Sequence, residues 1–152
     1  MNRPKVLVTR RWPEPCEARL RELFDVTFNT DNQPLTLEEL RDALRDHDAV
    51  LPTVSDKLPA EVFGDESPRC RILGNFGVGF NHIDMEAARA RGIVVTNTPG
   101  VLTESTADIA MMLMLMAARR ASEGERLLRG GQWTGWHPTQ LLGRQVTGKT
   151  LK

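Results

Sequence analysis

Residues 71–96 read RILGNFGVGFNHIDMEAARARGIVVT and contain a complete strand, turn, helix and strand. The apolar run 71–76 predicts a strand that leads directly into glycines. Asp84 is placed to cap the helix that follows, and Gly92 stands where a glycine commonly ends one. The β-branched run 93–96 predicts the next strand. A strand, a helix and a strand in this order predict two parallel strands with the helix packed on one face.

The same alternation extends back to the amino terminus. Thr36 and Glu39 have capping-box spacing before an apolar periodic run, which predicts a helix start. Proline donates no ladder hydrogen bond, so Pro52 is expected at the end of its strand. Earlier strands are expected at 5–9, 24–28 and 49–54, helices at 13–23 and 36–46, and a helical turn at 59–63. This order predicts an α/β fold, a parallel sheet with helices on both faces.

The organisation changes after Pro99. A long helix is expected from Thr103 to near Gly130, and its middle, 109–118, is apolar on every side. Such a helix is buried all round in a soluble protein, either by another domain or by another subunit. Its methionines suit an adaptable interface. The alternative is that the helix crosses the core of its own domain.

Composition excludes several classes of function. Twenty basic residues balance twenty acidic ones, so no electrostatic footprint indicates nucleic acid or an anionic membrane as partner. The run 109–118 is half the ~20 residues of a membrane-spanning helix. Cys16 and Cys70 lie in no metal-binding or disulfide pattern, and a cytoplasmic protein without a metal is expected.

Three glycines could form a ligand-binding loop. They are spaced Gly74-x-x-Gly77-x-Gly79 at the carboxyl end of a predicted parallel strand, where open α/β sheets bind ligands. Glycine lets a ligand approach bare backbone amides. The spacing does not match the dinucleotide fingerprint G-x-G-x-x-G, so a purely structural turn remains the alternative.

Two further segments are candidates. Hydroxyl and carboxylate side chains crowd residues 103–108, where they could cap the helix or face a cofactor. Trp133 and Trp136 lie in a glycine-rich segment and either pack on their own domain or enter a partner's pocket. No nucleophile elbow, phosphate-binding loop or zinc-protease motif occurs. The residues alone thus predict a binding scaffold without a reaction centre.

These segments, in this order, resemble the amino-terminal half of the D-isomer-specific 2-hydroxyacid dehydrogenases, with glyoxylate and hydroxypyruvate reductases closest. The matching motifs are GVGFNHID, GIVVTNTPGVLTESTADIAMMLML, GGQWTGW and GKTL. The resemblance implies a flavodoxin-like substrate-binding domain into which a Rossmann domain is inserted, with the active site between them. It also implies that the helix from Thr103 connects the domains and forms a homodimer.

The resemblance implies a role for five residues. The backbone amides of Val78 and Gly79 would hold the carboxylate of a small 2-oxoacid substrate, and Val54 would line the same pocket. Thr106 would contact the nicotinamide cofactor. Trp136 would enter the substrate pocket of the neighbouring subunit.

The resemblance also sets an expected domain plan: a substrate-binding domain at 1–100, an interdomain and dimer segment at 101–145, and a truncated start of the NAD(P)-binding domain at 146–152. Lys152 replaces an expected glycine. In the family the phosphate-binding glycines and the catalytic arginine and histidine come later. No catalytic residue is therefore expected in this chain, no turnover by it alone, and NAD(P)H held stably only by a full-length parent. The alternative is a non-catalytic flavodoxin-like module that binds or dimerises.

Overall fold

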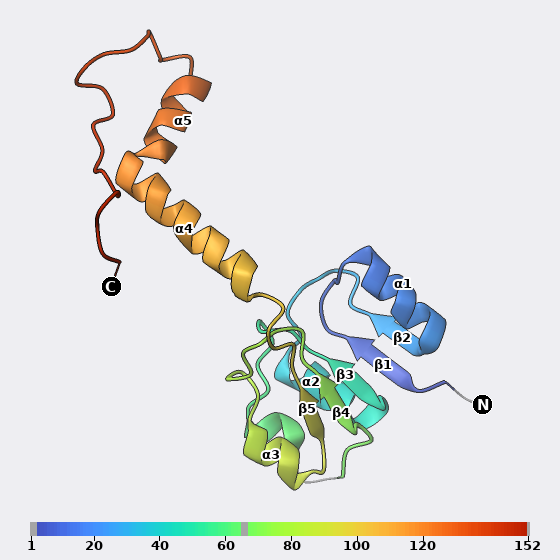
Figure 1. Cartoon of the computed structure of the whole chain (residues 1–152). Coiled ribbons are helices and arrows are strands. Elements are labelled where there is room, and N and C mark those ends of the chain that lie inside the picture. The colour runs from blue at the N-terminus through green and yellow to red at the C-terminus, as the bar shows by residue number, and fades with distance from the viewer. Residues whose placement is uncertain (1–2, 65–66, 152) are drawn as a thin grey trace. The chain divides into compact units, whose positions relative to one another are not determined.

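The computed structural model describes residues 3–64 and 67–151. The chain divides between Gly100 and Val101 into two compact units. In the described part of the first unit, five strands form one parallel sheet in the order β2-β1-β3-β4-β5 (Figure 1). The strands are β1 (Lys5–Val8), β2 (Asp25–Phe28), β3 (Ala49–Leu51), β4 (Ile72–Gly74) and β5 (Val94–Thr96). This order is the flavodoxin-like one, and it confirms the predicted parallel α/β fold.

The described part of this unit contains four helices, and two of them begin where a local side chain accepts from free backbone amides. They are α1 (Glu14–Leu23), α2 (Leu37–Asp46), the short 3₁₀ helix η1 (Ala60–Phe63) and α3 (Met85–Ala90). The predicted capping box is present, since the Glu39 amide donates to Thr36 Oγ1 and the Thr36 amide donates to Glu39 Oε2. Asp84 Oδ1 accepts from the amides of Glu86 and Ala87 at 3.1 and 2.9 Å. Both predicted helix starts are confirmed.

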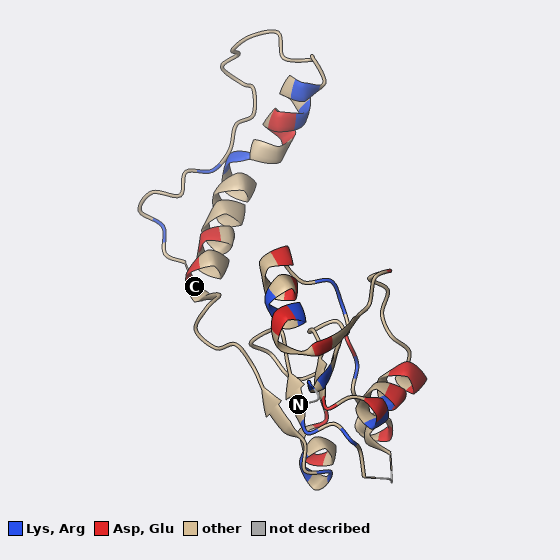
Figure 2. Cartoon of the chain, turned by 90° about the vertical axis from the view of Figure 1, so that its right-hand side faces the viewer, with Lys and Arg blue, Asp and Glu red and all other residues tan. Residues whose placement is uncertain are grey.

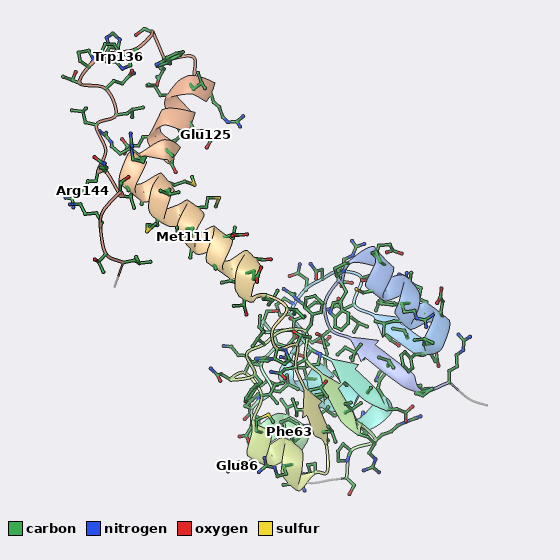
Figure 3. The ribbon with its side chains drawn as sticks, in the orientation of Figure 1. Phe63, Glu86, Met111, Glu125, Trp136 and Arg144 are labelled. Carbon is green, nitrogen blue, oxygen red and sulfur yellow. The ribbon has the colours of Figure 1, made fainter. Side chains whose placement is uncertain are left out.

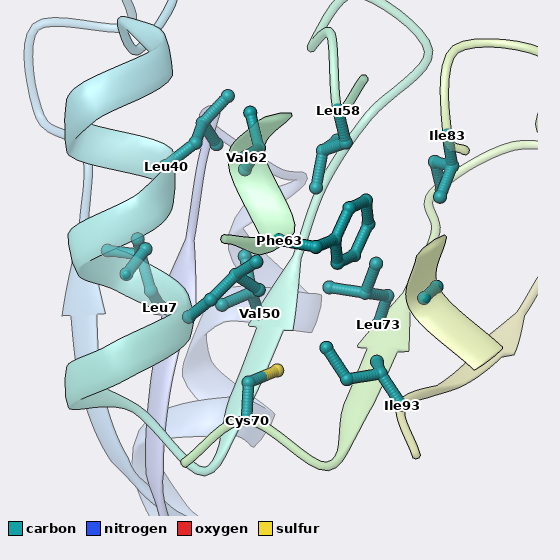
Figure 4. Packing of buried hydrophobic residues seen from close by; sticks show 13 residues of the cluster. Leu7, Leu40, Val50, Leu58, Val62, Phe63, Cys70, Leu73, Ile83 and Ile93 are labelled. Atoms are coloured by element: carbon teal, nitrogen blue, oxygen red, sulfur yellow. The ribbon is translucent and has the colours of Figure 1, made fainter. Parts of the chain in front are cut away.

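The main core lies on one face of the sheet. Leu7, Val50 and Leu73 point from β1, β3 and β4 into one apolar cluster (Figure 4). The helical side contributes Leu40, Ala43, Leu44, Val62, Phe63 and Ala88. Because strand side chains alternate between faces, α2, η1 and α3 cover this face together.

The opposite face carries α1. Val8 pairs with Phe28 in register, and the Arg21 guanidinium of α1 lies 4.6 Å from the centre of the Phe28 ring. Helices therefore lie on both faces, as predicted. Helices cover this second face less fully, because Ile72 and Val94, adjacent on β4 and β5, are both exposed.

Residues 101–151 of the second unit contain two helices rather than the single long one that the sequence predicts. They are α4 (Thr103–Arg119) and α5 (Ala121–Arg129). Arg120 separates them with left-handed backbone angles, φ 54° and ψ 35°. The prediction of one helix to Gly130 was wrong.

A tertiary contact accounts for this break. The Arg144 amide, distant in sequence, donates to Ala118 O at 2.7 Å. It therefore donates to a carbonyl at the end of α4 that a continued helix would bond to its own amide. Gly143 permits the approach, since a Cβ there would lie 2.6 Å from Ala118 O. Arg120 forms a two-point ion pair with Glu123 on the new helix. Such contacts offset the roughly 1–2 kcal/mol cost of a left-handed residue.

The apolar middle of α4 is exposed. No α4 side chain is buried, and Leu113 is 55% exposed. Figure 2 shows this stretch free of charged residues, and Figure 3 shows Met111 projecting from it. Within the described part of its own unit, this helix therefore crosses no core. None of the helices in the described ranges combines the length and hydrophobicity needed to cross a membrane.

The segment after α5 contains turns. Lys149 donates its amide to Val146 O at 3.0 Å across one of them, and residues 146–151 form no strand among the described residues. Lys152, where the sequence analysis expects a glycine of the next domain, lies outside the described residues.

Candidate functional site

Two segments run side by side beyond the carboxyl ends of β3 and β4. The Phe76 amide donates to Pro52 O at 2.8 Å, and Thr53 forms an isolated parallel bridge with Phe76. Pro52 follows the last strand residue, as predicted. The approach is close, because a Cβ on Gly77 would lie 2.6 Å from Val54 Cγ1. The structure thus places Val54 beside the glycine loop, here defined as residues 75–80.

A buried asparagine holds this loop from beneath. Asn75 is only 2% exposed. Its Nδ2 donates to Gly77 O at 3.1 Å and to Gly79 O at 2.9 Å. Carbonyl oxygens only accept hydrogen bonds, so these contacts settle which side-chain atom of Asn75 is the nitrogen.

A second asparagine donates to the carbonyl of Val78, which lies between Gly77 and Gly79 in the chain. Asn97 Nδ2, just after β5, donates to Val78 O at 2.9 Å. The Thr98 amide adds a further bond to Gly77 O at 3.1 Å. Three consecutive carbonyls of the loop are therefore occupied by donors from the protein.

The last three amides of the loop have no hydrogen-bond acceptor among the described residues. Within residues 3–64 and 67–151, the amides of Val78, Gly79 and Phe80 donate no hydrogen bond, and all three residues are exposed. A row of amides without an internal acceptor, in exposed residues, is suited to an anion, because each directs a fixed dipole at it without a mobile charge. The structure thus keeps both residues proposed for carboxylate binding accessible.

His82 completes the support of Asn75. Its Nε2 lies 3.0 Å from Asn75 Oδ1 and must carry the proton, since that oxygen is an acceptor. Burial lowers the pKa of His82, and the carboxylate of Asp56 opposes this shift. His82 is therefore neutral at pH 7 and donates to Asn75 as a neutral imidazole.

A buried polar network fixes the neighbouring segment. Asp56 is 2% exposed, and its Oδ2 accepts from Thr9 Oγ1 at 2.6 Å and from the Thr53 amide at 2.8 Å. These bonds tie the ends of β1 and β3 together. Trp12 packs on Phe76 with ring centres 4.7 Å apart and adds an aromatic wall at this edge.

Sequence reasoning missed five of these residues: Asn75, His82, Asn97, Asp56 and Trp12. A detectable signal existed for the asparagines. Each follows a short apolar strand directly, in the first positions beyond its carboxyl end. Polar side chains at these positions of neighbouring parallel strands share one edge of the sheet.

Thr106 and Trp136 belong to the second unit. Thr106 is exposed in the first turn of α4, and its amide donates to Leu102 O at 2.9 Å. Leu102 is the N-cap residue of α4, and no side chain caps this end. The alternative that the hydroxyl groups of residues 103–108 serve as a cap was therefore wrong.

Trp136 is 80% exposed in the loop after α5, where Figure 3 labels it. The alternative that it packs on its own domain was wrong. Trp133 is also exposed. The described ranges contain no cluster of three or more His, Cys, Asp or Glu side chains that could hold a metal ion.

Known proteins share this sequence and architecture. The chain is 42% identical over 153 aligned residues to a glyoxylate reductase of Thermococcus onnurineus, covering 98% of this chain and 46% of the relative. It therefore spans about half the length of the curated relatives it matches.

Solved structures agree. A Polaromonas sp. JS6 66 protein assigned to the NAD-binding D-isomer specific 2-hydroxyacid dehydrogenases superposes with a TM-score of 0.88 at 39% identity, over 95% of this chain and 46% of that one. The NADPH-dependent glyoxylate/hydroxypyruvate reductase of Sinorhizobium meliloti, solved with NADP and malonate, gives 0.74 at 33% identity, over 98% and 45%. The model of the D-isomer specific 2-hydroxyacid dehydrogenase catalytic domain matches residues 6–150, and the chain belongs to this family.

Proposed function

We propose that this chain is the substrate-binding part of an NAD(P)H-dependent reductase that converts small 2-oxoacids, such as glyoxylate and hydroxypyruvate, to 2-hydroxy acids. Its substrate carboxylate is held by the amides of Val78 and Gly79, and Val54 lines the same pocket. The observation that carries the proposal is a row of three exposed residues at the carboxyl edge of the parallel sheet whose amides donate no hydrogen bond within the described residues. This edge is where open α/β sheets bind ligands.

The second unit supplies the remaining parts of the proposal. Thr106 contacts the nicotinamide side of the cofactor. The exposed apolar middle of α4 forms a homodimer, and Trp136 reaches the substrate pocket of the partner subunit. In this plan residues 101–145 connect domains, and residues 146–152 lead into the cofactor domain. The free thiols of Cys16 and Cys70 suit a reducing cytoplasm.

Bound nicotinamide would supply the hydride. The residues of this chain would hold and orient the carboxylate, because amides stabilise negative charge without moving. Reduction also needs a proton donor as charge develops on the substrate oxygen. Backbone amides do not serve as that acid, and His82 already donates its Nε2 proton to Asn75. We therefore expect binding without turnover from this chain alone.

A titration tests the binding step. The ¹⁵N-labelled chain is titrated with oxamate, which carries the carboxylate and adjacent carbonyl of a 2-oxoacid but is not reduced. We expect saturable shifts of the Val78 and Gly79 amide resonances. Glycolaldehyde, which lacks the carboxylate, is the control and should leave them in place. Equal responses to both compounds, or none to oxamate, would contradict the proposal.

An assay tests the second part. The chain is mixed with NADH or NADPH and glyoxylate, and cofactor oxidation is followed by absorbance. We expect no rate above the uncatalysed one. Turnover that co-purifies with the chain would show that a catalytic acid lies within it.

A further inference from the structure

We propose that Asn75 is a positioning residue that turns the Val78 and Phe80 amides outward, and that the Phe80 amide is a further donor to the bound anion. The inference rests on the proposed function and deepens it. It assigns a cause to the exposed amides, and it adds one donor to the two already proposed.

The orientation follows from peptide geometry. The structure contains no cis peptide bond among its described residues, and a trans peptide directs its C=O and N–H in opposite directions. The Gly77 carbonyl and the Val78 N–H share one peptide group, as do the Gly79 carbonyl and the Phe80 N–H. Both carbonyls point at Asn75 Nδ2. Both N–H groups therefore point away from the buried asparagine.

Asn97 controls the peptide between them. It holds Val78 O, which shares its peptide group with the Gly79 N–H. The two asparagines thus orient different amides. Asn75 orients that of Phe80 and, together with the Thr98 amide, that of Val78, whereas Asn97 orients that of Gly79. Substituting each asparagine should therefore affect different amide resonances.

His82 sets the orientation of Asn75 itself. The Nε2–H of His82 donates to Asn75 Oδ1. Rotating the Asn75 amide by 180° would place its NH₂ group against this N–H, and its oxygen against the carbonyl oxygens of Gly77 and Gly79. Protonation of His82 would leave Nε2–H in place. The neutral and the protonated ring both keep the Asn75 nitrogen on the loop carbonyls.

The test compares Asn75→Leu with Asn29→Leu. Leucine matches asparagine in shape and adds no charge that would repel an anion directly. Asn29 is a matched control, because its Nδ2 also bridges two carbonyls, Thr9 O at 2.9 Å and Gln33 O at 2.7 Å, in a different loop. Oxamate affinity is measured from the amide shifts, and loop order from ¹⁵N relaxation of residues 77–80.

We expect Asn75→Leu to weaken oxamate binding by about tenfold or more, the effect of losing a hydrogen bond to a charged group. The Phe80 response should fall most and the Val78 response less, because the Thr98 amide still holds Gly77 O. The relaxation data should show residues 77–80 becoming mobile. Asn29→Leu should change affinity less than about twofold. Asn97→Leu should affect the Gly79 response alone.

Each other outcome is decisive. If Asn75→Leu leaves loop order unchanged, Asn75 does not position the loop, whatever happens to binding. If wild-type protein binds oxamate without a Phe80 response, the further donor is refuted while the proposed function stands. If wild-type protein binds no oxamate but Asn75→Leu mobilises the loop, the proposed function fails and the positioning role survives.

A measurement on wild-type protein guards against a variant that does not fold. The ¹⁵N shifts of the imidazole report which ring nitrogen of His82 carries the proton. We expect the proton on Nε2. A proton on Nδ1 would show that Asn75 is oriented differently and would overturn the proposal.

Discussion

The sheet unit and the α4–α5 unit use similar apolar residues in opposite ways. In the first, Leu73 and Val50 lie in a core cluster closed by helices. In the second, Ile109 and Leu113 belong to an equally apolar helix in which no side chain is buried. Hydrophobic pattern therefore predicts that a surface needs cover. It does not say whether the same chain provides that cover.

The largest difference between the units should appear on truncating matched leucines. Leu73→Ala removes a fully buried side chain and should lower the free energy of unfolding of the sheet unit by about 2–5 kcal/mol. Leu128→Ala, at an exposed position of α5, should cost under about 0.5 kcal/mol. Hydrogen exchange of the β1 and β3 amides measures the loss of stability caused by Leu73→Ala. Exchange of the α5 amides measures the loss caused by Leu128→Ala. Similar losses at both positions would mean that Leu128 is covered in solution.

The exposed middle of α4 should govern self-association. If it forms the proposed dimer, Leu113→Lys with Leu115→Lys should raise the dimer dissociation constant at least about 100-fold, since each buried leucine contributes about 1.5–3 kcal/mol. Sedimentation equilibrium measures this change. Leu128→Lys is the control, because that side chain is exposed outside the apolar middle. A wild-type chain that stays monomeric would exclude this dimer.

A smaller effect is expected at a cap whose contacts are local. Asp84→Ala removes the acceptor for two amides of α3 and should destabilise the sheet unit by about 1 kcal/mol in urea unfolding. Asp84→Asn keeps an acceptor oxygen and should retain most of the stability. Equal losses in the two variants would point to the charge rather than the cap.

The smallest change should be stabilising. Arg120→Gly relieves the left-handed conformation between α4 and α5 but loses an exposed ion pair, so a gain of up to about 1 kcal/mol is expected. Arg119→Gly lies within α4 and should instead cost about 1 kcal/mol. Thermal unfolding followed by circular dichroism compares them. Destabilisation by Arg120→Gly would show that the side chain contributes more than its backbone costs.

The first unit was predictable because its signals are local. The capping box at Thr36, the Asp84 cap and the alternation of short strands with helices each lie within a few neighbouring residues. Their consistency points to a single α/β architecture. The candidate site was predictable only in part. The glycines indicated a loop with accessible amides, but nothing nearby in sequence connects His82 with Asn75 or Asn97 with Val78.

The sequence by itself determined the sheet, the caps of α2 and α3 and the position of the glycine loop, because these depend on propensity and spacing over a few residues. Tertiary structure alone decided where the long helix breaks and which way the loop amides face. The first depends on Arg144 reaching Ala118, and the second on two asparagines reaching three carbonyls. The bonds from Arg144 to Ala118 and from Asn97 to Val78 join residues distant in sequence, and the short-range bonds from Asn75 depend on its burial under the loop. Neither kind of bond leaves a periodic pattern in the sequence, so only the folded chain reveals them.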